Sequence, residues 1–320
     1  MNDIGEVIMK TSETLTEKEI TPEFVEKERK RRNLRESLTG YAMISPWLLG
    51  FFGLIIGPMI YSFILSFTDY DMLSAPQWTG FSNYVELFTN DPRFIQSLQA
   101  TFTFVVIAIP LKLAFSLFLA LLFNTGRKGS GIFTTIYYVP SIIGGSVAIS
   151  VVWRQMFGRD GAVNTILDAW GLDTISFFGN SSAAMSILVI LIVWQFGAPM
   201  IIFLAGLRQI PDDLYEAASV DGAGIVRKFI KVTIPMLTPI IFFNLVMETI
   251  NGFMTFTQAF LITGGGPRDS TLFYAVYLYE VAFEFLNMGY ASAMAWILLV
   301  IIGAFTLLIF KSSTFWVHYD

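Results

Sequence analysis

The chain of 320 residues contains no cysteine and a single histidine, His318, close to its C-terminus. Disulfide bonds, thiolate nucleophiles and cysteine-based metal sites are therefore excluded, and histidine-based catalysis has almost no candidate. Charged residues are also scarce, at 14% of the sequence, whereas an average soluble domain has about 25%. The glycine-rich segment TGRKGSG at Thr125–Gly131 has the wrong spacing for a GxxxxGKS/T phosphate-binding loop. This composition argues against an enzyme, and against an ATPase in particular.

Apolar residues, in contrast, make up 54% of the sequence and form long runs. Runs of roughly 20 apolar residues are long enough to cross a bilayer as a helix. Six such runs predict an all-α polytopic membrane protein with six transmembrane helices, at Ala42–Phe67, Leu98–Phe123, Ile132–Trp153, Ala183–Leu207, Ile234–Leu261 and Gly289–Phe310. A seventh run, Leu272–Phe283, is half as long and contains an acidic residue, which predicts an amphipathic helix at the membrane surface.

Lysine and arginine are unevenly distributed around these runs. With the N-terminus inside, fifteen of them fall in inner segments and four in outer loops. This excess is typical of cytoplasmic loops, so both termini are predicted to be cytoplasmic. The predicted organisation is a charged tail over 1–41 lying on anionic lipid, a membrane domain over 42–311 and a short tail over 312–320. Aromatic residues of the outer loops predict an interfacial belt: Trp78, Trp170, Tyr274, Tyr277 and Tyr279. The first span follows the tail directly and is predicted to be an uncleaved anchor.

One inner segment, PDDLYEAASVDGAGIVRKFIKVTIP from Pro211 to Pro235, is polar and carries strong helix signals. Pro211 suits a helix start, and the two aspartates after it favour the positive end of the helix dipole. Gly222 and Gly224 allow a sharp turn, and a second helix is expected from about Ile225. Taken alone, these residues fit two interpretations equally well: a docking element for another protein, or an ordinary connecting loop with good helix caps.

The spacing within this segment resembles a known motif. It is similar to the EAA motif in the membrane subunits of binding-protein-dependent ABC importers. The segment has Glu216-Ala217-Ala218, then three residues, Gly222, nine residues and Val232-Thr-Ile-Pro235. Val and Ile stand where that family usually has Ile and Leu.

Further stretches extend the resemblance to the MalF-type carbohydrate permeases, over about 42–310. They are WRQMFGRDGAVN from Trp153, LITGGGPRDST from Leu261 and AFEFLNMGYASA from Ala282. The chain is therefore identified as a member of this family, with a MalF/MetI-like ABC importer permease fold, in a bacterial cytoplasmic (inner) membrane.

The resemblance implies that the segment 208–235 couples the membrane helices to a cytoplasmic ATPase. Glu216 would meet a basic residue of the ATPase, and Gly222 would allow the turn. The implied coupling surface consists of Glu216, Ala217, Ala218, Asp221, Gly222 and Ala223. The implied partners are a second homologous permease, two ABC ATPase subunits that bind ATP and magnesium, and an extracytoplasmic solute-binding protein that delivers a sugar or oligosaccharide. No cofactor on this chain and no nucleic-acid partner are expected.

Polar residues within the predicted spans indicate a second site. Lys112 and Glu248 lie near the middle of the second and fifth spans, where ionisable residues are costly and usually functional. Asn251 and Thr255 follow Glu248 on one helical face, which predicts a polar cavity or a hydrogen-bonded helix interface. The resemblance also implies which residues form the substrate pathway. By their position relative to the family's substrate site, these are Trp194, Gln195, Phe196, Glu248, Asn251, Gly252 and Met254. Lys112 is added because it is a charged residue within a span.

Alternatives remain at this point. Lys112 and Glu248 either pair or contact substrate, or Lys112 snorkels or packs against a partner subunit. A proton-coupled secondary transporter would use the same two residues. An importer of an anionic oligosaccharide or a polyol fits the sequence as well as an importer of a neutral sugar.

Overall fold

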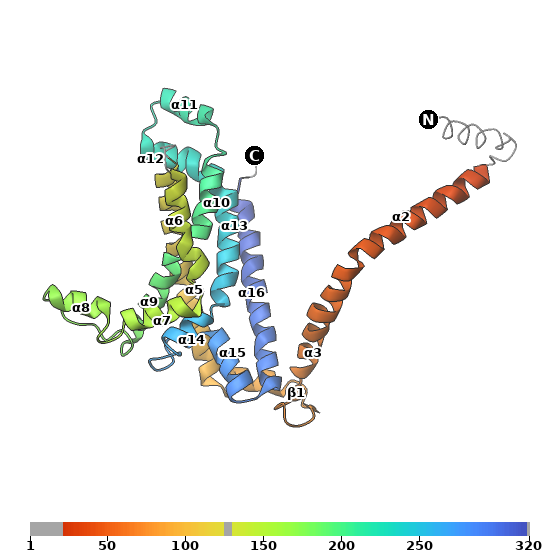
Figure 1. The fold of residues 1–320 in the computed structure, drawn as a ribbon, viewed down its shortest axis with the longest axis horizontal. Helices are drawn as coiled ribbons and strands as arrows, with labels where there is room; N and C mark the ends of the chain where they lie inside the picture. The colour runs from red at the N-terminus through yellow and green to blue at the C-terminus, as the bar shows by residue number, and fades with distance from the viewer. Residues whose placement is uncertain (1–21, 125–129, 319–320) are drawn as a thin grey trace, which may run out of the picture. The chain divides into compact units, whose positions relative to one another are not determined.

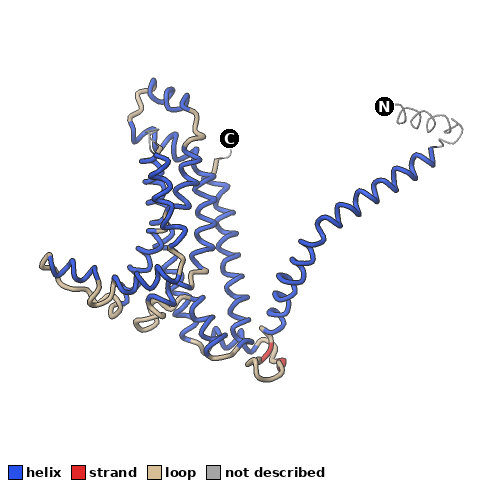
Figure 2. Tube along the Cα trace, in the orientation of Figure 1, coloured by secondary structure: helices blue, strands red, loops and turns tan. Residues whose placement is uncertain are grey.

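The computed structural model describes residues 22–124 and 130–318, so the start of the N-terminal tail and most of the glycine-rich segment 125–131 lie outside the described residues. The chain divides into two units, 1–62 and 63–320. Within the described ranges most residues of the membrane domain are helical, and loops and one short hairpin join the helices, as Figure 2 shows.

The described part of the first unit, residues 22–62, is one helical path. Helix α2 (Pro22–Gly50) continues through a π-helical segment, η1 (Phe51–Ile56), into α3 (Gly57–Leu65). Residues 33–65 form a helix long and apolar enough to cross a membrane. The helix starts well before the predicted span because the charged residues there are good helix formers. The expected boundary at residue 41 is therefore not a break in secondary structure.

The second unit is a helical bundle with one two-residue hairpin, β1 (Thr68–Asp69) paired with β2 (Gln77–Trp78). Figure 1 shows how its elements are arranged. They are α4 (Ser82–Thr89), α5 (Pro92–Phe123), α6 (Ser130–Ile143), α7 (Val147–Met156), α8 (Ala162–Ala169), α9 (Ser181–Trp194), α10 (Gly197–Leu207), α11 (Asp212–Val220), α12 (Ile225–Lys228), η2 (Phe229–Thr233), α13 (Ile234–Phe253), α14 (Thr257–Ile262), α15 (Tyr274–Tyr279), η3 (Glu280–Glu284) and α16 (Met288–Trp316).

Helices or bent helix pairs lie at all six predicted spans, but two of these spans are broken, and the fifth ends at Phe253 rather than Leu261, before the separate helix α14. Four described helices are long and apolar enough to cross a membrane alone, and two bent helix pairs raise the number to six. The third span is not a straight helix, because α6 and α7 meet at 93°. Gly144 and Gly145 form the break just after Pro140. The fourth span bends by 43° between α9 and α10.

Helix α5 lies at the centre of the second unit and packs against α9, α10 and α13. Its buried face includes Phe104, Ala108 and Ile109. Close packing of the neighbours depends on glycine: a Cβ on Gly206 of α10 would collide with Ile240 of α13. Small residues at such contacts let membrane helices approach closely, since lipid provides little hydrophobic drive for their association.

The outer face of α16 is apolar and exposed. Leu307 is 70% exposed and Val300 64% exposed. Exposed apolar surface of this extent is unusual for a soluble protein and is what a lipid-facing helix requires. Helix α16 also continues past the predicted span to Trp316, and the His318 backbone N–H donates to Thr238 Oγ1 at 3.0 Å. The C-terminal segment is therefore packed on α13 rather than a separate tail.

The expectation of a surface helix at Leu272–Phe283 is wrong. Its helical part forms α15 and η3, and the segment is packed into the bundle: Leu272, Phe273, Tyr274 and Val276 are at most 1% exposed. The Tyr274 hydroxyl donates to the Met294 carbonyl. Tyr274 and Tyr277 are therefore core residues rather than members of an interfacial belt, whereas Trp78 and Trp170 are exposed as expected.

Candidate functional site

A polar cavity of about 370 Å³ lies among the broken helices and α13. It is lined from α5, α6, α9, α10, α13 and α14 by Ile109, Lys112, Ser141, Gly145, Ile192, Gln195, Ala198, Glu248, Asn251, Gly252, Met254, Thr255, Phe256, Thr257 and Gln258. Amide and hydroxyl groups alternate there with apolar surface. Such a lining can donate and accept hydrogen bonds around a hydroxylated solute.

Lys112 and Glu248 form an ion pair within this lining. Lys112 Nζ lies 2.7 Å from Glu248 Oε2, and the two residues are only 8% and 9% exposed. The expectation that both point inward is confirmed, and of the alternatives for Lys112 the structure shows the paired one. A buried charge is strongly destabilising unless an opposite charge pairs with it, so each residue allows the other to be buried. The pair also joins α5 to α13 across 136 positions of sequence.

Six of the eight predicted pathway residues line this single cavity, and two do not. Trp194 packs its ring beside Trp153, with 5.7 Å between centroids. Phe196 is 4% exposed and packs edge-on against Phe115. Both rings flank Gln195, which does reach the cavity. They therefore support the wall rather than form its surface.

Gly252 has a packing role in addition to its place in the lining. A Cβ at this position would lie 3.1 Å from Val105 Cγ2 and 3.2 Å from Ile109 Cδ1. Both are closer than ordinary van der Waals contact. The absence of a side chain therefore lets α13 approach α5 and bring Glu248, one turn earlier, toward Lys112.

Sequence reasoning missed the contribution of the third span. Ser141 Oγ donates to the Gln195 carbonyl at 2.9 Å and accepts from the Ala198 N–H at 3.0 Å. It thus satisfies backbone groups that the break between α9 and α10 leaves free. Proline at 140 and the glycine pair after it, inside an apolar run, were the available signal for a broken helix near a binding site.

The segment 208–235 forms the expected helix–turn–helix. Helix α11 ends in a Schellman motif: the Ala223 N–H donates to the Ala218 carbonyl, and the Gly222 N–H donates to the Ser219 carbonyl. Gly222 has φ +74°, which a residue with a side chain adopts only at a cost. Gly224 has φ −71° and needs no such freedom.

The second helix of this segment continues directly into the membrane. Helix α12 runs through the π-helical segment η2 into α13 without a gap. Glu216, Ala217 and Asp221 are exposed. Tyr215, on the same helix, hydrogen-bonds through its hydroxyl to Thr233 Oγ1 at 3.0 Å. A force on α11 would therefore reach the end of α13 through this contact and through the continuous backbone.

The opposite end of the bundle is held by charged groups at the start of α5. Arg93 lies 3.1 Å from Asp269 Oδ2 and 3.0 Å from Glu280 Oε2. Asp91 Oδ2 accepts hydrogen bonds from the hydroxyls of Tyr277 and Tyr290. Burial raises the pKa of Glu280 above its usual range, although Arg93 counteracts the effect.

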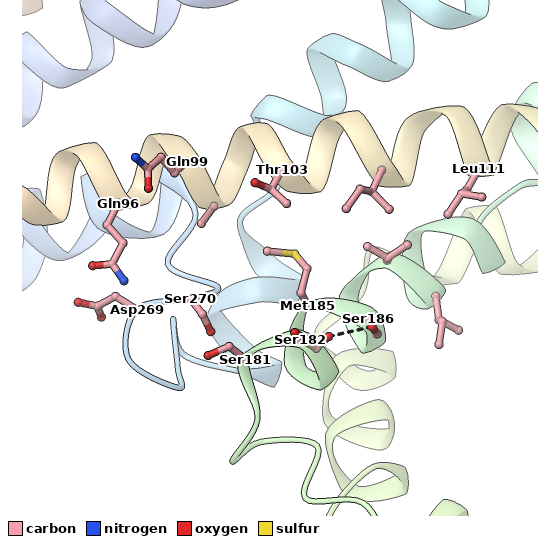
Figure 3. A pocket seen from close by; sticks show the side chains of 14 residues that line it. Gln96, Gln99, Thr103, Leu111, Ser181, Ser182, Met185, Ser186, Asp269 and Ser270 are labelled. Carbon is pink, nitrogen blue, oxygen red and sulfur yellow. Dashed lines mark hydrogen bonds between the residues drawn. The ribbon is translucent and has the colours of Figure 1, made fainter.

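A second cavity of about 710 Å³ is lined by α5, α9 and the 269–270 loop (Figure 3). Polar side chains gather where the 269–270 loop crosses it, including Gln96, Ser181 and Ser270, and apolar ones line the rest. Among the described residues Ser270 Oγ is a buried hydroxyl without a hydrogen-bond partner. None of the predicted pathway residues lies in this cavity.

The sequence matches the family described as "Binding-protein-dependent transport system inner membrane component" over residues 113–318. The chain belongs to this family. It is thus an inner-membrane permease subunit of a binding-protein-dependent ABC importer rather than an enzyme, and in such systems ATP is hydrolysed by separate subunits. Among the residues that the structure describes, no group of His, Asp and Glu could hold a metal ion.

Named relatives extend the comparison over most of the permease. It is 52% identical over 296 residues to the probable ABC transporter permease protein YesP of Bacillus subtilis (strain 168), covering 91% of this chain and 96% of the relative. It is 32% identical to the lactose transport system permease protein LacF of Rhizobium radiobacter, covering 86% and 94%. The trehalose/maltose permease MalF of Thermococcus litoralis is 30% identical, with 88% and 95% covered.

A solved structure confirms the fold. A chain from the crystal structure of a bacterial alginate ABC transporter, in complex with an alginate pentasaccharide-bound periplasmic protein, superposes with a TM-score of 0.76. It is 23% identical in sequence, and the match covers 88% of this chain and 96% of the other. The MalF/MetI-like arrangement expected from the EAA spacing is therefore the fold that is found.

Proposed function

We propose that this permease forms part of the pathway by which an ABC importer translocates a sugar or oligosaccharide. The observation that carries the proposal is the cavity around Lys112, Gln195, Glu248 and Asn251. Besides the ion pair, its lining includes the amides of Gln195, Asn251 and Gln258 and the hydroxyl of Thr257, groups that can donate to and accept from sugar hydroxyls. Several relatives, LacF and MalF among them, are named as sugar permeases, which supports the same solute class.

The segment 208–235 is the proposed docking site for the ATPase. Its exposed EAA helix ends in a fixed turn and is joined to α13, which carries Glu248 and Asn251. ATP-driven movement of the docked subunit would thus reach the cavity wall along one continuous helix. By the positive-inside distribution, this end and both termini face the cytoplasm.

The remaining partners follow from the same proposal. A second, homologous permease would complete the pathway, two ATPase subunits would bind below, and an extracytoplasmic solute-binding protein would deliver the sugar to the opposite end. The proton-coupled alternative is disfavoured by the family, whose members work in binding-protein-dependent systems.

Uptake by the assembled transporter in proteoliposomes tests this function. We expect labelled saccharide to accumulate only when ATP is enclosed with the ATPase subunits and loaded binding protein is present on the opposite side. Asn251→Leu should reduce uptake by removing a cavity amide, whereas Asn180→Asp, which keeps a side-chain oxygen at the start of α9 and lies outside the cavity, should not. Uptake of saccharide without ATP, or no uptake of any saccharide, would contradict the proposal.

A further inference from the structure

Four aromatic side chains form a continuous row at the end of the bundle that lies opposite the segment 208–235. Phe256 and Phe260 come from α14 and its N-terminal cap, and Tyr279 and Phe283 come from α15 and η3. The centroid of the Tyr279 ring lies 5.1 Å from that of Phe256, 5.2 Å from that of Phe260 and 5.1 Å from that of Phe283. Two consecutive elements of the chain, α14 and the helix formed by α15 and η3, thus contribute rings to one surface.

The two ends of this row differ in their surroundings. Phe256 lines the polar cavity beside Thr257 and Gln258. Phe283, at the other end, is 56% exposed, and Tyr279 between the two is half-buried, as is Phe260, which packs beside Phe256 and Tyr279. The row therefore runs from the cavity to the surface of the molecule, and each intermediate ring keeps part of its area accessible.

We propose that Phe256, Phe260, Tyr279 and Phe283 form an aromatic track on which the sugar stacks between delivery and the cavity. A pyranose presents apolar C–H faces and a rim of hydroxyls. Aromatic faces bind the former through apolar contact and dispersion, without hydrogen bonds that would hold the solute in one place. The row therefore suits a sugar that moves along it, whereas the amides of the cavity suit a sugar that is held in one orientation. This inference rests on the proposed sugar import and adds the route and its binding groups.

The arrangement of the rings separates this role from simple core packing. A ring needed only for packing would be buried, as Phe104 and Phe273 are at 0% and 1% exposed. Phe283 keeps more than half of its surface open although it contacts Tyr279. Continuity with the lining of the cavity identifies the solute, rather than lipid, as the occupant that the row fits.

Leucine substitutions in the assembled transporter test the track, because leucine keeps apolar bulk and removes the ring face. Phe283→Leu and Tyr279→Leu should each lower saccharide uptake roughly threefold to tenfold, the value of one aromatic contact. ATP hydrolysis stimulated by the binding protein should stay unchanged, so that the number of sugars imported per ATP falls. Phe283→Tyr and Tyr279→Phe, which keep the ring, should import as the wild type does.

Phe285 provides the matched control, since it is 59% exposed and two positions from Phe283 but lies outside the row. Phe285→Leu should leave uptake unchanged. Wild-type uptake by both leucine variants of the row, or equal impairment by Phe285→Leu, would overturn the track while leaving the importer intact. A wild-type transporter that hydrolyses ATP but imports no saccharide would instead overturn the sugar assignment on which the track rests.

Discussion

Lys112 on α5 and Glu248 on α13 form a buried ion pair with 2.7 Å between Nζ and Oε2, in the lining of the cavity that is proposed to bind the sugar. Each charge is stable there because of the other. Helix α13 also continues back to the segment 208–235, so the pair lies on the path from the proposed motor to the proposed solute site.

Replacing one residue of this pair should lower the stability of the protein more than replacing both. Lys112→Met leaves the Glu248 carboxylate buried without its partner, which in comparable cases costs about 3–5 kcal/mol. The double variant Lys112→Met, Glu248→Leu removes both charges and should recover most of that loss. Thermal unfolding of the purified permease in nanodiscs checks this order. A double variant less stable than Lys112→Met alone would show that the pair is not the reason for the loss.

A side chain should destabilise the turn at position 222 but should have no such effect at position 224. Gly222→Ala forces a left-handed conformation at a cost of about 1–2 kcal/mol. Gly224→Ala has an ordinary φ, and its added Cβ meets no atom within 4 Å. Retention of the ATPase on tagged permease should fall for Gly222→Ala and stay normal for Gly224→Ala. Equal retention by the two variants would argue that the turn has no role in docking.

Glu216 should contribute more to ATPase binding than other acids of the same helix. An interfacial charge that meets a basic residue typically costs about 2–5 kcal/mol when its partner is left unpaired. Glu216→Gln should therefore weaken ATPase binding strongly. Asp213→Asn removes the same charge from the first turn of α11 and serves as the control. Binding can be measured by titrating the ATPase onto permease in nanodiscs, and similar affinities for both variants would contradict a specific contact at Glu216.

Stability should depend on pH through Glu280. Because burial raises its pKa in the folded protein, the folded state holds the proton more tightly than the unfolded state. The resulting stabilisation is complete below the usual pKa of 4.5 and is lost as pH rises through the raised value. Glu280→Gln should flatten the dependence of the unfolding temperature on pH above 4.5. Glu284→Gln removes a neighbouring negative charge that adds to this rise, so it should flatten the dependence less than Glu280→Gln does. An unaltered profile in Glu280→Gln would refute the assignment.

The sequence was sufficient where structure depends on local spacing. Apolar runs of bilayer length placed the spans, and the interval from Ala218 to Gly222 predicted a turn that the Schellman hydrogen bonds confirm. Helical periodicity around Glu248 also predicted the polar wall of α13. In each case the decisive contacts lie within a few residues along the chain.

Features that depend on distant partners were not predictable in the same way. The charge and the short length of the segment 272–283 can be read from the sequence, and both are typical of a surface helix. The residues that it packs against cannot be read from the sequence. Thr101 accepts the Tyr274 N–H and Asp91 accepts the Tyr277 hydroxyl, across 173 and 186 positions. The 43° bend between α9 and α10 likewise frees backbone groups whose partner, Ser141, lies 54 and 57 positions away.

Recovery of partners from the native membrane tests the central claim most directly. Tagged permease extracted in mild detergent is purified, and the proteins that accompany it are identified by mass spectrometry. Wild-type protein should bring with it an ABC ATPase and a second permease, and Gly222→Ala should bring less of the ATPase. A chain that is recovered alone and still moves solute in liposomes without ATP would contradict this claim.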